Sequence, residues 1–328
     1  MSTEGGTKAI VAALTANLGI AITKFVAFLL TGASSMLAEA VHSVADSGNQ
    51  LLLLIGGKRA KREATPEHPF GFGRERYVYG FVVSIVLFTV GGLFALYEAW
   101  HKLQEALDGH GAITGRWWWV PLAVLVVAIG MEGYSFRTAV RESNHVRGER
   151  SWAQFIRSAK APELPVILLE DFAALCGLVF ALIGVGLTLL TENAVWDAAG
   201  TALIGILLVL VAVTLALEMK SLLIGEAASR DNIQKLRDAL VGEGDTGVDR
   251  IIHMRTMHIG PEELLVAAKL AVDRSDRGEE IATAIDGAER RAREALKELR
   301  LTIYLEPDID RARRAGSAGA EPRAGLPG

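Results

Sequence analysis

Six long apolar runs fill most of the first 220 residues and decide what this chain can fold into. The runs span residues 8–30, 34–57, 77–100, 117–140, 164–190 and 196–219. Each is near or above the ~20 residues that an α-helix needs to cross a bilayer. Because 51% of the 328 residues are hydrophobic, too little polar sequence is left to cover these helices in water. The sequence predicts an α-helical membrane protein with six transmembrane helices.

The distribution of positive charge predicts how the helices are oriented. Lys and Arg residues gather between the second and third spans (58–76) and between the fourth and fifth (137–160), whereas the opposite loops offer little more than Lys102 and Arg116. The positive-inside rule then places both termini in the cytoplasm. The first run lacks the features of a cleaved signal peptide, so we expect it to remain as a span. The expected location is the plasma (inner) membrane.

The character of the sequence changes after Lys220. Two amphipathic helical patterns and three alternating strand patterns follow in the order αββαβ, which predicts a small cytoplasmic α+β domain of ferredoxin-like type. From residue 310 on, Arg, Ala, Gly and Pro dominate without apolar periodicity. The expected organisation is a transmembrane domain over 1–222, a cytoplasmic domain over 223–309 and a disordered tail over 310–328.

A polar stripe runs along the second span. Glu39, His42, Asp46 and Asn49 are three or four residues apart, which places them on one face of a helix. Because His42 and Asp46 stand one turn apart, one helix can offer an imidazole and a carboxylate to a single divalent ion. Ionisable groups inside a membrane usually mark a functional site. A stripe that is merely hydrated at a helix end is the structural alternative.

Other ionisable residues also fall inside predicted spans. Glu170 and Asp171 interrupt the fifth span, and because neighbours on a helix point about 100° apart, we expect one to face the site and the other a neighbouring group or water. Glu132 is an acid in the fourth span, and Lys24 in the first is a candidate counter-charge. We expect Glu39, Asn49 and Glu132 to line an ion pathway.

The segment from "SSMLAEAVHSVADSGNQ" to "HPFGFGRERYVYG" resembles the second and third spans of the cation diffusion facilitator family, which are zinc-transporter-like metal/proton antiporters. The "HSxxD" element and the "HPFGFGR" loop carry the resemblance, together with the six spans and the αββαβ domain ending in "IYLEP". It covers roughly residues 8–307 and implies a homodimer. The Leu-Leu-Glu-Asp motif in the fifth span is typical of a divergent branch.

The resemblance implies that His42 and Asp46 are metal ligands on the second span and that Asp171 is a ligand on the fifth. The family usually has a His or Asp one turn before that acid, but this chain has Ile167. Glu170, water or Glu132 could each supply the fourth ligand, and Glu170 is our candidate among the metal-binding residues.

The cytoplasmic part departs from relatives that bind regulatory zinc there. Ala268, Tyr304 and Glu306 stand where such proteins have His and Asp ligands. We expect His253 and His258 to be exposed on the strand region and the domain to serve dimerisation. In the "HPFGFGR" loop we expect a turn, with Arg74 and Arg76 at the inner membrane face or pairing across the dimer.

These observations predict a secondary active transporter that exports a divalent cation from the cytoplasm in exchange for protons. Zn²⁺ fits the mixed nitrogen and oxygen ligands, and Mn²⁺, Fe²⁺ or Co²⁺ would also be accepted. The ion is cargo, and we expect no resident cofactor. Without a hydrolase motif we expect no enzyme, and with a net charge of −4 no nucleic-acid partner. The alternative is a non-transporting membrane scaffold or metal sensor acting through its cytoplasmic domain.

Overall fold

The computed structural model describes residues 2–31, 34–108, 118–244 and 246–309, apart from the side chains of residues 2–5, 30–31, 34–39, 41 and 42. The chain divides into two compact units, Met1–Ile224 and Gly225–Gly328. The predicted disordered tail, residues 310–328, lies outside the described residues.

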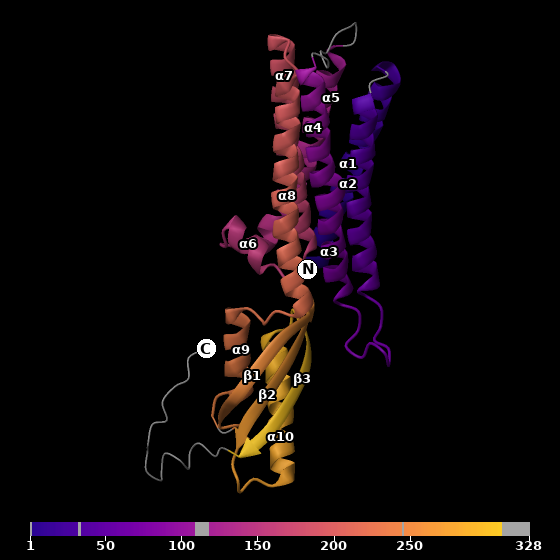
Figure 1. Ribbon diagram of the computed structural model, residues 1–328. Coiled ribbons are helices and arrows are strands. Elements are labelled where there is room, and N and C mark those ends of the chain that lie inside the picture. Colours follow the sequence, from indigo (N-terminus) through magenta and orange to yellow (C-terminus); the bar gives the residue numbers. More distant parts are fainter. Residues whose placement is uncertain (1, 32–33, 109–117, 245, 310–328) are drawn as a thin grey trace, which may run out of the picture. The chain divides into compact units, whose positions relative to one another are not determined.

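The first unit is a bundle of long helices (Figure 1). Its elements are α1 (Ser2–Thr31), α2 (Ser34–Arg59), α3 (Glu75–Val86), η1 (Leu87–Leu93), α4 (Phe94–Leu107), α5 (Val120–Arg147), α6 (Trp152–Ser158), α7 (Glu163–Thr191) and α8 (Val195–Ile224). The predicted third span corresponds to α3, η1 and α4 in succession, with the π-helical η1 in its middle. A long helical stretch therefore stands at each of the six predicted positions.

Five helical stretches of the described residues are long and apolar enough to cross a membrane. They are Gly6–Leu29, Glu75–Leu107, Val120–Arg147, Glu163–Thr191 and Val195–Ile224. Helix α2 has 26 residues but is not one of the five, because the polar stripe around Asp46 and Asn49 lowers its hydropathy. The predicted fold class is confirmed. Helix α2 is the predicted span whose polar residues lower its hydropathy below that of the other five.

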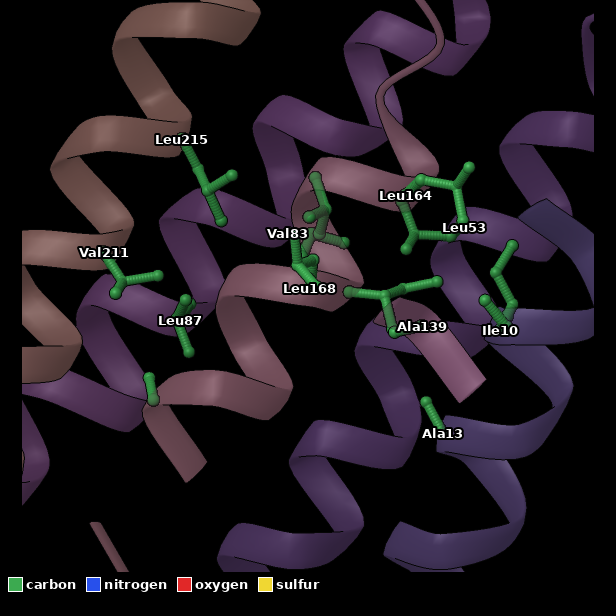
Figure 2. Close-up of a cluster of buried hydrophobic side chains, with 14 of the residues drawn as sticks. Ile10, Ala13, Leu53, Val83, Leu87, Ala139, Leu164, Leu168, Val211 and Leu215 are labelled. Carbon is green, nitrogen blue, oxygen red and sulfur yellow. The ribbon is translucent and has the colours of Figure 1, made fainter. Parts of the chain in front are cut away.

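A hydrophobic cluster joins the helices of the bundle. Figure 2 shows Ile10 and Ala13 from α1, Leu53 from α2, Val83 from α3, Leu87 from η1, Ala139 from α5, Leu164 and Leu168 from α7, and Val211 and Leu215 from α8. Many of the residues outside this cluster are large apolar side chains that remain exposed, among them Leu29, Leu190 and Leu217. Apolar side chains on the outer surface are what a helical bundle surrounded by hydrocarbon requires.

Helix α8 packs closely on two neighbours through glycines. A Cβ atom on Gly92 would lie 2.6 Å from Val209 Cγ2, and one on Gly205 would lie 2.8 Å from Leu96 Cγ. On the other neighbour, a Cβ on Gly184 would lie 2.9 Å from the Trp196 carbonyl oxygen, and one on Gly200 would lie 2.9 Å from the Phe180 carbonyl oxygen. Small residues at such crossings let membrane helices approach to backbone contact.

We expect Gly200→Ala to destabilise the bundle by about 1–3 kcal/mol, because the new methyl group meets backbone atoms that cannot rotate away. Gly186→Ala is the matched control on α7, where a Cβ meets nothing within 4 Å, and the higher helix propensity of Ala should leave stability equal or slightly increased. Unfolding in mixed SDS micelles measures both. Equal stabilities of the two variants would contradict close packing at the α7–α8 crossing.

The second unit is a three-stranded sheet with two helices (Figure 1). Its elements are α9 (Arg230–Val241), β1 (Arg250–Gly260), β2 (Glu263–Val272), α10 (Gly278–Ala295) and β3 (Arg300–Ile309). Strands β1 and β2 form an antiparallel hairpin, and β3 returns through α10 to pair parallel with β2. The αββαβ order is confirmed. The hairpin turn is tighter than the predicted one, because β1 continues through His258 to Gly260.

The core of the second unit is built from apolar residues that alternate along the strands and from the apolar faces of the two helices. Leu264 and Leu270 of β2 are fully buried, as are Leu236 of α9 and Ala288 of α10. The small residues of α10 let that helix lie close to the sheet. Burial raises the pKa of Glu263 above its ordinary value, and the opposing effect of the neighbouring Arg300 is smaller.

Candidate metal centre

The side chain of Glu170 is held between α2 and α7. Asn49 Nδ2 donates to its Oε1 at 2.9 Å, and Gln50 Nε2 donates to its Oε2 at 3.0 Å. Gln50 in turn accepts a hydrogen bond from Asn17 Nδ2 of α1 at 3.3 Å. Because Glu170 is buried, these amide donors replace water on both of its carboxylate oxygens.

The neighbouring Asp171 points to a different helix. Its Oδ2 accepts a hydrogen bond from Ser135 Oγ of α5 at 2.7 Å. Its Oδ1 is buried and has no hydrogen-bond partner among the described residues, and the same holds for Oδ1 of Asn49. A buried oxygen without a donor is unusual unless something else fills the place. Asp171 therefore has one oxygen fixed by the protein and one available to a ligand.

Glu132 of α5 completes a group of acidic side chains in the middle of the bundle. It is 2% exposed, and it lies within electrostatic range of Asp171, Asp46 and Glu170. Asp46 of α2 also lies within range of Glu170 and Asp171. Helices α2, α5 and α7 thus place four carboxylates within electrostatic range of one another, where a divalent cation would offset their mutual repulsion.

Two predicted site residues, Glu39 and His42, lie on α2, but their side chains are not among those described. No group of three His, Cys, Asp or Glu side chains close enough to hold a metal ion occurs among the described side chains. The structure therefore brings the carboxylates of Asp46, Glu132, Glu170 and Asp171 into one region without a preformed ligand cluster in its described part.

The hydrogen-bonding residues of this region are not apparent from helical spacing alone. Gln50 is fully buried and links two helices through its amide, although it stands just outside the predicted polar stripe. Its signal in the sequence is a glutamine that follows Asn49 immediately before four leucines. Ser135 lies three residues after Glu132, on the same face of α5, which is the corresponding signal for the fourth span.

A buried ion pair ties the start of α3 to the start of α7. The guanidinium of Arg76 donates through Nε and through a second nitrogen to the two oxygens of Glu163, and both side chains are at most 8% exposed. The prediction that Arg76 faces the membrane surface or a dimer partner is therefore wrong. The turn predicted for the preceding loop is confirmed, since Thr65 and His68 exchange backbone hydrogen bonds and Gly71 has a φ of +75°.

The histidines of the second unit differ in their surroundings. His253 is exposed and lies opposite Lys269 in the β1–β2 register. His258 is buried instead, with Nδ1 3.3 Å from the Gly260 carbonyl oxygen, so the predicted exposure of this residue is wrong. Strand β1 continues to Gly260, so His258 lies in the strand and not in the turn that we predicted. Glu306, which stands where such relatives have a ligand, makes an ion pair instead, since Lys269 Nζ lies 2.9 Å from its Oε1.

The fold and the buried carboxylates define an integral membrane protein with a polar site between its helices. A family model described as the cation efflux transmembrane domain matches residues 10–224. The chain belongs to this cation efflux family, which confirms the resemblance found in the sequence. The match covers α2, α5 and α7, the helices that carry the acidic residues.

Three similar proteins show how far the likeness extends. The mitochondrial proton-coupled zinc antiporter of Xenopus laevis is 30% identical over 273 residues, 83% of this chain and 48% of that protein. Metal tolerance protein C4 of Arabidopsis thaliana is 26% identical over 268 residues, 80% of this chain and 56% of that protein. The magnetosome protein MamM of Magnetospirillum gryphiswaldense is 28% identical over 116 residues, 35% of this chain and 36% of that protein.

The chain spans about half the length of the first two of these relatives. The name of the Xenopus protein places it in mitochondria. This similarity supports an integral membrane location and does not support the plasma membrane that we predicted from the sequence.

Proposed function

We propose that this protein is a secondary transporter that moves a divalent metal cation, Zn²⁺ first among the candidates, out of the cytoplasm in exchange for protons. The observation that carries the proposal is Oδ1 of Asp171, which is buried, has no hydrogen-bond partner in the described part of the chain and belongs to a carboxylate within electrostatic range of Asp46 and Glu132. Membership of the cation efflux family and the likeness to a protein named as a proton-coupled zinc antiporter support it.

In this proposal Asp171 and Asp46 are oxygen ligands and His42 is the nitrogen ligand. Ser135 holds Asp171 in place through its hydrogen bond, so that the other oxygen faces the ion. We rank Glu170 below Asp171 as a ligand, because both of its oxygens already accept amide hydrogen bonds. Carboxylate and imidazole ligands also suit Mn²⁺, Fe²⁺ and Co²⁺.

Proton exchange follows from the chemistry of the ligands. A carboxylate or an imidazole must lose its proton before it binds a metal, so metal binding releases protons and reprotonation releases the metal. An imidazole changes its charge between pH 5 and 8, which makes His42 the proposed exchanging group. We further propose that a homodimer carries out this cycle in the membrane.

The test is metal uptake into sealed proteoliposomes that carry a pH gradient. We expect Zn²⁺ flux that depends on the gradient and is accompanied by proton counter-flow, with the latter lost in His42→Ala. A fluorescent metal indicator and a pH-sensitive dye inside the vesicles report the two fluxes separately. The absence of flux for Zn²⁺, Mn²⁺, Fe²⁺ and Co²⁺ would favour a membrane scaffold or sensor, and unchanged proton counter-flow in His42→Ala would contradict the assignment of the exchanging group.

A further inference from the structure

The two ends of the buried Asn49 amide on α2 have different surroundings. The side chain is 1% exposed. Its Nδ2 donates a hydrogen bond to Glu170 Oε1 at 2.9 Å, whereas its Oδ1 is buried and has no hydrogen-bond partner among the described residues. A buried amide oxygen without a donor is costly, because it has lost the hydrogen bonds of water without replacing them. The packing of the described helices does not account for this oxygen.

The neighbouring Gln50 provides a comparison within the same helix. It is also fully buried, and its Nε2 also donates to Glu170, to Oε2 at 3.0 Å. Its own oxygen, however, accepts a hydrogen bond from Asn17 Nδ2 of α1 at 3.3 Å. Both ends of the Gln50 amide are therefore bound by the protein. Asn49 shares the contact with Glu170 and differs in its oxygen, and this difference indicates a ligand from outside the chain.

The position of Asn49 relates its oxygen to the proposed metal centre. A carboxylate only accepts hydrogen bonds, so the NH₂ group faces Glu170 and Oδ1 lies on the other side of the amide. Asn49 stands three residues after Asp46 on α2, and side chains at this spacing have Cβ atoms about 5–6 Å apart. Glu170 directly precedes Asp171, whose Oδ1 is likewise buried without a partner among the described residues. Helices α2 and α7 thus each contribute one such oxygen next to or within a proposed ligand.

This inference rests on the proposed function. We propose that Oδ1 of Asn49 is the fourth ligand of the transported cation, beside His42, Asp46 and Asp171. A side-chain amide supplies a neutral oxygen of the kind that hard divalent cations accept, and it complements the imidazole, which suits Zn²⁺. Two carboxylates already balance the charge of a divalent cation, and the amide adds no third negative charge. Glu170 is then a positioning residue that orients Asn49 through its hydrogen bond.

The test compares the two neighbouring amides. Asn49→Leu removes one hydrogen-bond donor of Glu170 together with the proposed ligand oxygen. Gln50→Met is the matched control, because it removes the other donor of Glu170 and the link to Asn17 but leaves Asn49 in place. Zn²⁺ binding to the full-length protein in detergent is measured by isothermal titration calorimetry. Unfolding in mixed SDS micelles shows whether each variant is folded.

We expect Asn49→Leu to bind Zn²⁺ at least ~10-fold more weakly than the wild type, and Gln50→Met to bind within about threefold of it. Wild-type binding in Asn49→Leu, or an equally large loss in Gln50→Met, would overturn the role of Asn49 as a ligand. If either variant does not fold, the same pair is compared in the Glu170→Gln background, where no buried carboxylate loses a donor, and the same two outcomes decide. A wild-type protein that binds and moves no metal would contradict the proposed function itself.

Discussion

Zinc flux through the Asp171→Asn variant is expected to fall at least ~100-fold below that of the wild type. Loss of an outer-shell partner of a metal ligand already costs 10- to 100-fold, and this substitution removes the charge of a proposed ligand while keeping an oxygen for Ser135. Ser135→Ala removes only the hydrogen-bond donor to Asp171, so we expect zinc flux in this variant to fall by the smaller factor of about 10 to 100. Both are measured as initial rates in proteoliposomes, after the reconstituted amounts of protein have been matched.

Glu170→Gln is the matched control for Asp171→Asn, because the two residues are neighbours on α7 and are both buried. The amide introduced by Glu170→Gln keeps an oxygen that accepts from one of the two donors, Asn49 or Gln50, so we expect flux to remain within tenfold of the wild type. An equal loss in both variants would make Glu170 a ligand as well. If the Asp171→Asn variant transports zinc at the wild-type rate, Asp171 is not a ligand.

Breaking the buried ion pair is expected to have the largest effect on stability. Glu163→Leu leaves the Arg76 guanidinium without its carboxylate in a place where the side chain is only 8% exposed. Removing one partner of a buried ion pair typically destabilises a protein by about 3–5 kcal/mol. We expect a loss of this size in the free energy of unfolding, measured by SDS titration with circular dichroism.

The double variant Arg76→Met with Glu163→Leu is the control for this prediction. Two apolar side chains of similar volume leave no buried charge, and such replacements are often neutral or stabilising. We expect the double variant to regain most of the stability lost in Glu163→Leu. A double variant as unstable as the single one would show that the pair contributes through its hydrogen-bond geometry rather than through the compensation of a buried charge.

The positions of the spans and the αββαβ order could be predicted because they depend on local patterns. Apolar runs of ~20 residues and alternation along a strand are properties of neighbouring residues. Periodicity also indicated that Glu170 and Asp171 face different directions, and they do contact different helices. The π-helical segment Leu87–Leu93 could not be predicted, since the residues of this run fit an ordinary α-helix equally well.

The contacts inside the bundle could not be predicted, because they join residues that are far apart in the chain. Gln50 and Glu170 are 120 positions apart, and Arg76 and Glu163 are 87 apart. Helical spacing gives the face of a residue but not the neighbour that this face meets. Arg76 resembles one more member of a basic loop in the sequence, and only the ion pair with Glu163 at the start of α7 shows that its charge is compensated internally.

The composition of α2 has a consequence for how the chain is made. Insertion of a helix from the translocon into the membrane costs about 2.5–3.5 kcal/mol for each Asp, Lys or Arg at its centre, and α2 carries Asp46 together with Asn49 and Gln50. The preceding α1 is strongly apolar and packs beside it. We therefore expect α2 to depend on α1 for its entry into the bilayer and the two helices to insert as one hairpin. Asp46, a proposed ligand of the cargo, is then also one of the residues that make the biogenesis of α2 depend on its neighbour.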